Sequence, residues 1–398
     1  MDEGLRRTLD YAWAHREEEA TRLLLGKGAE GVDLRRAAQQ IEGWQSARRK
    51  WPQFALCRDY RYAPRLNREQ SSSEATAGYK RSLLAGRMGD DALMADLTGG
   101  MGIDTLALAS LTQREVAYVE RDVALCDLMR HNAEVLGCAN VRVHCADSME
   151  WLAQHAQQYD LLYLDPARRD GLGRKVAAFE DCLPNIVEHI ELLKSRARRL
   201  LVKASPMMDI DAGATLFGGG VEVHVVSVGG ECKELLYLWD AARGEEPLTL
   251  HCVATDGKAV RDFAFRREEE QACEGCYAAQ MGRYLYEPEA SLMKGGPYKL
   301  LGARCGVQLL GRNTHLYTST ELREWEWGRR WEVLQELPLN RKAVRAALPE
   351  GRAHVVTRNY PVRAEVLQRQ LGLAEGGELF VVATTIGQRK VGLLCRSV

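Results

Sequence analysis

Several features that would place a protein in a membrane or outside the cell are absent from this 398-residue sequence. No apolar run approaches the roughly 20 residues that a helix needs to cross a bilayer. The segment from Met1 to Glu19 is charged throughout and lacks the apolar centre of a secretory signal. Eleven cysteines are scattered without a pairing rhythm, and there is no internal repeat. We therefore expect a cytoplasmic protein with reduced thiols and no membrane partner.

The chain also lacks a large net charge: it has 54 Lys and Arg residues and 55 Asp and Glu residues, for a formal net charge of −1. The charges are nevertheless unevenly distributed along the chain. Ten Lys and Arg residues face three Asp and Glu residues between Trp44 and Arg87, and ten face four between Pro338 and Val398. These two basic segments are either solvated helix faces or surfaces that bind a polyanion such as nucleic acid.

The length and the 46% content of hydrophobic residues predict two or three domains with buried cores, at about 150 residues for each domain. Residues 1–85 carry apolar side chains at helical spacing, for example Ala37, Ala38 and Ile41, and are predicted to form a helical N-terminal region.

From Asp91 to Asp240 the pattern changes to alternating strands and helices, which is typical of a parallel sheet covered by helices. The last two apolar runs of this stretch, Val221–Val228 and Lys233–Trp239, are joined by four residues, too few for a parallel crossover, so they must be antiparallel. The other predicted strands are Leu93–Leu97, Val116–Val119, Val141–His144, Leu161–Leu164 and Leu200–Val202, and the predicted helices are 102–112, 122–136, 148–157 and 180–195.

We assign this α/β domain to residues 86–244. A small α+β region follows at 245–325, where short strand-like runs lie among glycines and a ferredoxin-like fold is one interpretation. The last unit, 326–398, has strands and helices in alternation and is predicted to be a small α/β domain of its own.

The segment from Asp96 to Asp104 carries the strongest functional signal: a strand ends in Asp96, glycines follow, and a helix starts near Gly102. Such a turn lets the backbone approach a ligand at the carboxyl edge of a sheet. The third position of a dinucleotide fingerprint is Thr105 rather than glycine, and a Walker lysine is missing. The loop therefore favours an adenosyl ligand without phosphates, with a purely structural turn as the alternative.

Acidic residues also end the next three strands of this sheet, at Glu120, Asp147 and Asp165. A carboxylate about 20 residues after the glycine turn can accept hydrogen bonds from ribose hydroxyls, and Asp147 would then lie within reach of an adenine amino group. Each acid alone could be a helix cap. Four acids at four successive strand ends favour a binding site.

On these motifs the region resembles class I S-adenosylmethionine-dependent methyltransferases, whose hallmark is a sheet of seven strands with the last one reversed. The whole chain resembles a bacterial group of them with a C-terminal THUMP-like domain. The segments that carry this second resemblance are Gln70-x-Ser-Ser-Glu74, Asp165-Pro-Ala-Arg-Arg169, Lys203-Ala-Ser-Pro206 and Asn313-Thr-His-Leu-Tyr317.

The resemblance implies a role for each matching residue. Asp165 and Pro166 would belong to the catalytic loop, and Arg168, Arg169, Lys203 and Ser205 would contact the substrate. The residues implied in binding S-adenosylmethionine are Asp96, Thr98, Gly99, Gly100, Gly102, Asp104, Glu120, Arg121, Asp147, Ser148 and Asp165.

The loop chemistry limits the reaction. Amino-directed nucleic-acid methyltransferases carry an aromatic residue where this chain has Arg168, and uracil methyltransferases use a cysteine where this chain reads Lys203-Ala-Ser-Pro206. A covalent cysteine intermediate is therefore disfavoured, and we expect direct transfer to a nitrogen or oxygen.

We expect the acceptor to be RNA, a base of tRNA or rRNA, because THUMP domains of related enzymes bind RNA and this segment is basic. The alternatives are a protein or small-molecule acceptor, or a non-catalytic RNA-binding protein with the same fold. No metal is expected, because Cys273 and Cys276 have no second ligand pair at finger spacing. The oligomeric state is not predicted.

Overall fold

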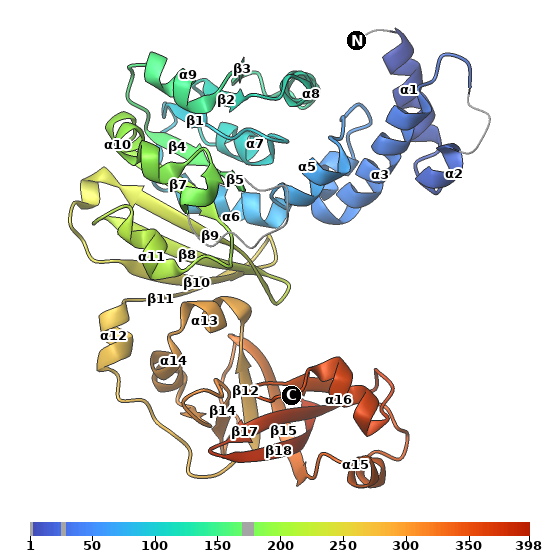
Figure 1. The fold of residues 1–398 in the computed structure, drawn as a ribbon, viewed down its shortest axis with the longest axis vertical. Helices are drawn as coiled ribbons and strands as arrows, with labels where there is room; N and C mark the ends of the chain where they lie inside the picture. Colours follow the sequence, from blue (N-terminus) through green and yellow to red (C-terminus); the bar gives the residue numbers. More distant parts are fainter. Residues whose placement is uncertain (1–2, 25–28, 169–178) are drawn as a thin grey trace. The chain divides into compact units, whose positions relative to one another are not determined.

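The computed structural model describes residues 3–24, 29–168 and 179–398. The chain forms two compact units (Figure 1). The first contains Met1–Val228, Lys233–Leu248 and Thr255–Arg261, and the second contains Gly229–Cys232, Thr249–Ala254 and Asp262–Val398. Within the described ranges, no helix is both long enough and apolar enough to cross a membrane.

The first unit begins with a group of helices, which confirms the predicted helical N-terminal region. Asp33 caps the longest helix by accepting hydrogen bonds from two backbone amides, and Trp51-Pro52 ends it. Its apolar stripe, including Ile41, packs against the two preceding helices. The helices are α1 (Glu3–Ala14), α2 (Ala20–Leu24), α3 (Leu34–Lys50), α4 (Pro52–Ala55), α5 (Arg65–Gln70) and α6 (Glu74–Ala85).

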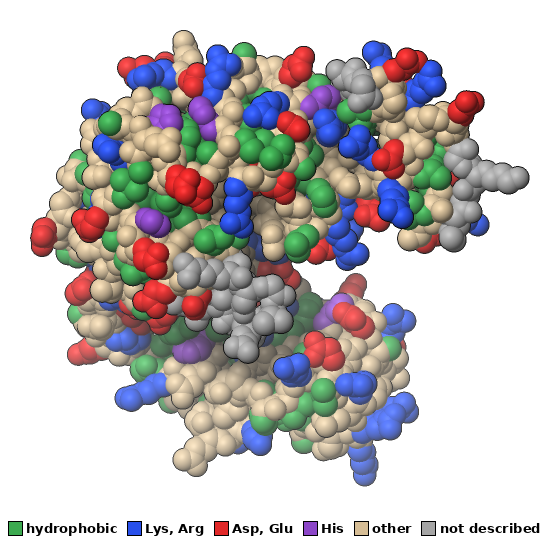
Figure 2. Space-filling view, turned by 45° about the horizontal axis from the view of Figure 1, so that its top comes forward, with side chains coloured by type: hydrophobic (Ala, Val, Ile, Leu, Met, Phe, Trp, Pro, Cys, Tyr) green, Lys and Arg blue, Asp and Glu red, His purple; other side chains and the backbone are tan. Residues whose placement is uncertain are grey.

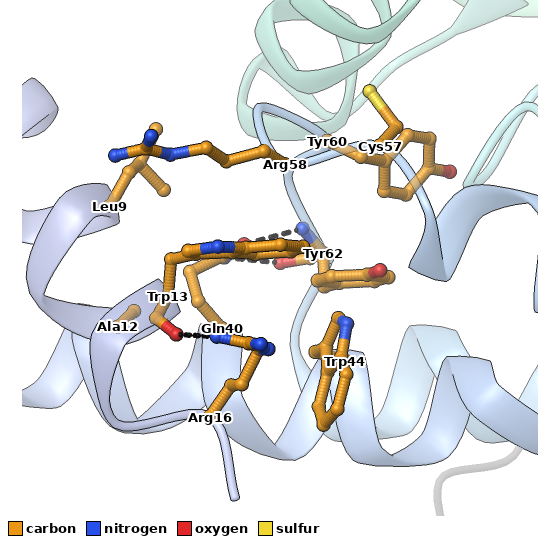
Figure 3. Close-up of a pocket in the computed structure, with 10 residues that line it drawn as sticks. All are labelled: Leu9, Ala12, Trp13, Arg16, Gln40, Trp44, Cys57, Arg58, Tyr60 and Tyr62. Atoms are coloured by element: carbon orange, nitrogen blue, oxygen red, sulfur yellow. Dashed lines mark hydrogen bonds between the residues drawn. The ribbon is translucent and has the colours of Figure 1, made fainter.

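Aromatic rings hold α1 against α3 and the segment that follows it (Figure 3). The guanidinium of Arg16 lies 4.5 Å from the ring centroid of Trp13 and 5.4 Å from that of Trp44. Gln40 exchanges two hydrogen bonds with the backbone of Tyr62, at 3.0 and 2.8 Å. The hollow between these side chains measures about 20 Å³, close to the space of one water molecule, so it is too small for a nucleoside.

Seven strands of the first unit form a sheet in the order β8-β9-β7-β4-β1-β2-β3. The pairs from β7 to β3 are parallel, whereas β9 is antiparallel to β7. This reversed strand and the strand order confirm the predicted fold class. The strands are β1 (Met94–Asp96), β2 (Val116–Glu120), β3 (Val141–Cys145), β4 (Leu161–Leu164), β7 (Arg199–Ala204), β8 (Val221–Val228) and β9 (Glu231–Asp240).

Helices cover both faces of this sheet: α6 packs on α7 at one face, and α9 packs on α10 at the other (Figure 1).

The prediction of a helix from residue 180 was wrong at its start. A 3-10 turn (Phe179–Asp181) and a short strand come first, and Asn185 then caps the helix after Pro184. The bounds are α7 (Ile103–Ala109), α8 (Val123–Val135), α9 (Ser148–Gln154), α10 (Ile186–Arg196), α11 (Ile210–Thr215), β5 (Ala167–Arg168) and β6 (Cys182–Leu183).

The second unit is built on a sheet of seven strands in the order β13-β14-β12-β15-β18-β17-β16, with two hydrophobic clusters centred on Val344 and Trp331. Because β12 pairs with β15, residues on both sides of position 325 share this sheet. Its strands are β12 (Tyr284–Pro288), β13 (Gln308–Leu309), β14 (Tyr317–Ser319), β15 (Gly328–Leu337), β16 (His354–Thr357), β17 (Leu379–Ile386) and β18 (Arg389–Ser397). The remaining elements are β10 (Thr249–Thr255), β11 (Val260–Phe265), α12 (Arg267–Ala272), α13 (Ala290–Gly295), α14 (Tyr298–Cys305), α15 (Arg341–Ala347) and α16 (Ala364–Leu371).

Candidate active site

A cavity of about 1100 Å³ lies at the carboxyl ends of β1, β2, β4 and β7 in the first unit, the edge where parallel α/β sheets bind ligands. The cavity brings together most of the residues that the sequence singled out. They are Asp96, Thr98, Gly99, Gly100, Gly102, Asp104, Glu120, Arg121, Asp147, Ser148, Asp165, Pro166, Lys203 and Ser205. The backbone of Arg168 forms β5, and Arg169 lies outside the described residues.

The side chain of Asp96 binds residues on both sides of the glycine loop. Its side chain is buried, and one carboxylate oxygen accepts hydrogen bonds from the backbone of Thr98 at 3.0 Å and the other from the hydroxyl of Thr105 at 2.6 Å. Burial raises the pKa of Asp96 to about 7, although both hydrogen bonds oppose the shift. Asp96 therefore shapes the loop, and its carboxylate is engaged within the protein.

The loop itself lies on β2 and needs glycine at two positions. A Cβ at Gly99 would come within 2.3 Å of the Tyr118 ring, whose hydroxyl donates to the carbonyl of Gly100 at 2.7 Å. Gly102 has a left-handed conformation (φ 76°) and caps α7, and a Cβ there would meet the sulfur of Met129 at 2.3 Å. Close packing on β2 thus fixes the loop that starts α7.

Two of the strand-end acids face the cavity but already bind backbone amides. Glu120 accepts from the amide of Gly100 at 3.0 Å through one oxygen and from Asp122 at 2.9 Å through the other. Asp147 caps α9 by accepting from Met149 and Glu150. Capping, which the sequence left open for each acid, is thus observed for Asp147, whose Oδ1 accepts both bonds. Its Oδ2 and both oxygens of Glu120 keep capacity for a further donor.

Asp165 forms the other side of the site. Its carboxylate accepts a hydrogen bond from the ammonium of Lys203, and its backbone amide donates to the Thr98 hydroxyl at 2.6 Å. Burial alone would lower the pKa of Lys203, but Asp165, Glu234 and Asp104 together raise it above the ordinary value. Lys203 therefore stays charged and donates its hydrogen bond to the Asp165 carboxylate as a cation.

The sequence prediction missed the part of the cavity wall that the N-terminal region supplies. Leu66, Asn67, Gln70, Ser71 and Ser72 all line the cavity. The segment from Gln70 to Glu74 could have indicated this part of the cavity. A run of polar side chains before a helix is typical of a helix cap and also of the lining of a binding cavity. Asn185, Glu188 and His189 at the start of α10 were missed as well.

The residues present fit an adenosyl sulfonium ligand. Carboxylates at two strand ends can accept hydrogen bonds from ribose hydroxyls and an amino group, and the volume exceeds what a nucleoside fills. The loop from Asp96 to Asp104 contains no lysine or arginine that would hold a pyrophosphate.

The chain is similar to a solved structure of a proposed methyltransferase from Porphyromonas gingivalis W83, with 30% identity, a TM-score of 0.85 and coverage of 98% of both chains. It therefore belongs to that family, the class I S-adenosylmethionine-dependent methyltransferases with a C-terminal THUMP-like domain. The protein is a methyltransferase, and the residues that line its cavity fit S-adenosylmethionine as the cofactor.

Two regions also match described domain families: residues 328–397 match the family described as THUMP domain-like, and residues 284–324 match a ferredoxin-like domain. The proposed methyltransferase yhhF from Escherichia coli shares 22% identity and covers 43% of this chain and 88% of its own, with a TM-score of 0.33. An rRNA methylase from Streptococcus thermophilus shares 16% identity and covers 41% and 93%, with a TM-score of 0.31. No curated protein matches the chain.

The raised pKa of Asp96 predicts a pH dependence of stability. A carboxyl group with a pKa of about 7 in the fold and an ordinary value in the unfolded chain stabilises the fold below the ordinary value. That contribution is lost as the pH rises from about 4 to about 7. In Asp96→Asn the free energy of unfolding should lose this slope, at most about 1.4 kcal/mol per pH unit. Urea titrations at several pH values would measure it, and identical slopes in both proteins would contradict the assignment.

Gly102→Ala should weaken binding of S-adenosylhomocysteine at least tenfold, because the new Cβ strains the backbone and displaces Met129. Gly137→Ala is a matched control: its φ of 70° is equally left-handed, but nothing lies within 4 Å of the new Cβ. Calorimetry should show a loss of stability in both variants, larger in Gly102→Ala, and a loss of affinity in Gly102→Ala alone. Equal affinities would argue against the loop as the binding element.

Proposed function

We propose that this methyltransferase transfers a methyl group directly to a nitrogen or oxygen of an RNA base, in tRNA or rRNA. The observation that carries the reaction type is the placement of Asp165, which lines the cavity beside the glycine loop. Lys203 binds its carboxylate, and the Thr98 hydroxyl accepts a hydrogen bond from its backbone amide.

The bound cofactor supplies an electrophilic methyl group on a sulfonium. The Asp165 carboxylate, held in place by Lys203, accepts a hydrogen bond from the N–H or O–H of the acceptor and so orients the nucleophilic lone pair. The same carboxylate takes up the proton that the acceptor loses. Thr98 fixes the backbone of Asp165 relative to the loop at 2.6 Å, which limits how far the carboxylate moves.

A covalent cysteine pathway is not needed in this proposal. Lys203 near the end of β7 and Ser205 directly after this strand line the cavity, where a nucleophilic cysteine would stand in a uracil methyltransferase. Cys182 does line the cavity, but it belongs to β6, where its partner is Arg168 of β5.

Exposed aliphatic side chains support a flat, partly apolar acceptor such as a base. Leu66 and Leu183 line the cavity and are 63% and 37% exposed, and Met207, between two lining residues, is 55% exposed. Large apolar side chains left in water beside a catalytic carboxylate favour contact with the faces of a ring. These aliphatic side chains offer a base an apolar contact surface, because the catalytic loop after Asp165 lacks the aromatic residue of amino-directed methyltransferases.

The charges of the second unit support RNA as the partner. Three of the ten cations between Pro338 and Val398 form ion pairs in the described chain. The seven others are exposed cations of the THUMP-like match, and Figure 2 shows Lys and Arg side chains on this unit, in its lower part. They are Arg341, Lys342, Arg345, Arg352, Arg363, Arg369 and Lys390. Unpaired cations at this density suit a phosphate backbone.

The basic segment of the first unit has a different character. Six of its ten cations form intramolecular ion pairs: Arg48, Arg58, Arg65, Arg68, Lys80 and Arg87. We therefore assign the main phosphate contacts to the second unit. The eleven cysteines, which form no disulfide in the described part of the chain, support a cytoplasmic setting.

Asp165→Asn should bind S-adenosylhomocysteine within about threefold of the wild-type affinity but lose methyl transfer by at least a hundredfold, because the amide cannot take a proton. Cys182→Ser should keep activity. Calorimetry and incorporation of tritiated methyl groups into total RNA measure the two effects. Full activity in Asp165→Asn, or its loss in Cys182→Ser, would refute the direct mechanism.

Association with total tRNA should fall steeply with salt, in a linear relation between the logarithms of affinity and salt concentration. Reversing Arg341, Lys342 and Arg345 of α15 to Glu should weaken binding and flatten that slope. The control Arg341→Lys/Arg345→Lys keeps the charge and should keep the slope. Affinity that ignores salt would instead indicate a small neutral acceptor, and an unchanged slope after reversal would exclude α15 as a contact.

A further inference from the structure

A buried cluster of charges lies directly behind the cavity, and its central cation comes from the N-terminal helical region. Lys80 of α6 is 1% exposed. Its ammonium donates hydrogen bonds to the hydroxyl of Ser72 at 2.9 Å, to Asp104 at 3.0 Å and to Glu234 at 3.1 Å. All of its donors are thus directed into the first unit, at one point behind the sheet edge.

Asp104 connects this cation to the glycine loop. It is the second residue of α7, two positions after the N-cap Gly102. While one of its oxygens binds Lys80, the other accepts from Ser72 at 2.6 Å and from the Tyr163 hydroxyl at 2.9 Å. Three hydrogen bonds to Asp104 therefore fix the first turn of the helix whose start forms the cofactor loop.

Glu234 connects the same cation to the catalytic side. This carboxylate on β9 is 2% exposed and lies 2.9 Å from the ammonium of Lys80. It also attracts Lys203, the partner of Asp165. Burial alone would lower the pKa of Lys80, but Asp104 and Glu234 raise it above the ordinary value, so the cation persists across the physiological range.

We propose that Lys80 is a positioning residue for methyl transfer: through Asp104 it holds the cofactor loop, and through Glu234 and Lys203 it sets the position of Asp165. The N-terminal helical region is then a working part of the catalytic site, since it supplies Lys80 and Ser72. The proposal does not depend on which methyl acceptor the enzyme uses.

Three variants and a control test this proposal with S-adenosylhomocysteine as the probe, in calorimetry and thermal melting. Lys80→Met leaves two buried carboxylates without their cation and should lower both the melting temperature and the affinity, the latter at least tenfold. In Lys80→Met/Glu234→Gln one stranded charge is removed, so the melting temperature should recover while the affinity stays low. Ser72→Ala strands no charge and should fold, with an affinity at least threefold weaker.

The matched control is Arg87→Met, which breaks an ion pair of 2.7 Å with Glu222 next to the same helix, away from the cavity. It should lower stability and leave the affinity within twofold. The proposal is overturned if affinity returns together with stability in the double variant, or if Ser72→Ala binds like the wild type. Because no RNA is used, these outcomes are separate from a failure of the RNA assignment.

Discussion

The site depends on the compensation of buried negative charge. Asp96, Asp104 and Glu234 are all buried at or behind the carboxyl edge of the sheet, and Asp165 adds a fourth carboxylate at the cavity. A buried carboxylate without a partner would lower the free energy of unfolding by several kcal/mol, or it would take up a proton and become neutral. Here Lys80 and Lys203 compensate three of them, and Asp96 relies on two threonine hydrogen bonds and a raised pKa. This charge balance fixes the loop, the helix that follows it and the carboxylate that faces the acceptor.

Much of this arrangement could be predicted from the sequence because parallel strands obey a simple geometry. Every acid that ends such a strand lies at the same edge of the sheet, so the sequence alone predicts that Asp96, Glu120, Asp147 and Asp165 share one site. The reversed strand β9 was also predicted, since four linking residues leave no room for a crossover. In both cases the prediction needs only the position of a residue relative to its own strand, or the length of the link between two neighbouring strands.

The remaining features depend on contacts between distant segments, which local spacing does not encode. Lys80 has the sequence context of an ordinary helix residue. Its two acidic partners, Asp104 and Glu234, follow it by 24 and 154 positions in the sequence. The basic character of residues 44–87 suggested a polyanion surface, yet most of those cations are paired with acids such as Glu17 and Glu222. The start of α10 was misplaced because Pro184 and the Asn185 cap override an apolar pattern that continues upstream.

The central claim is that the cofactor lies at the carboxyl edge of the sheet between the glycine loop and Asp165. Hydrogen–deuterium exchange of the full chain with and without S-adenosylhomocysteine tests it most directly, because it reports where backbone amides become protected. The account predicts protection in the peptides that contain residues 96–104, 120–122 and 146–148, and none in the second unit. Protection confined to other segments, or none at saturating ligand, would contradict it.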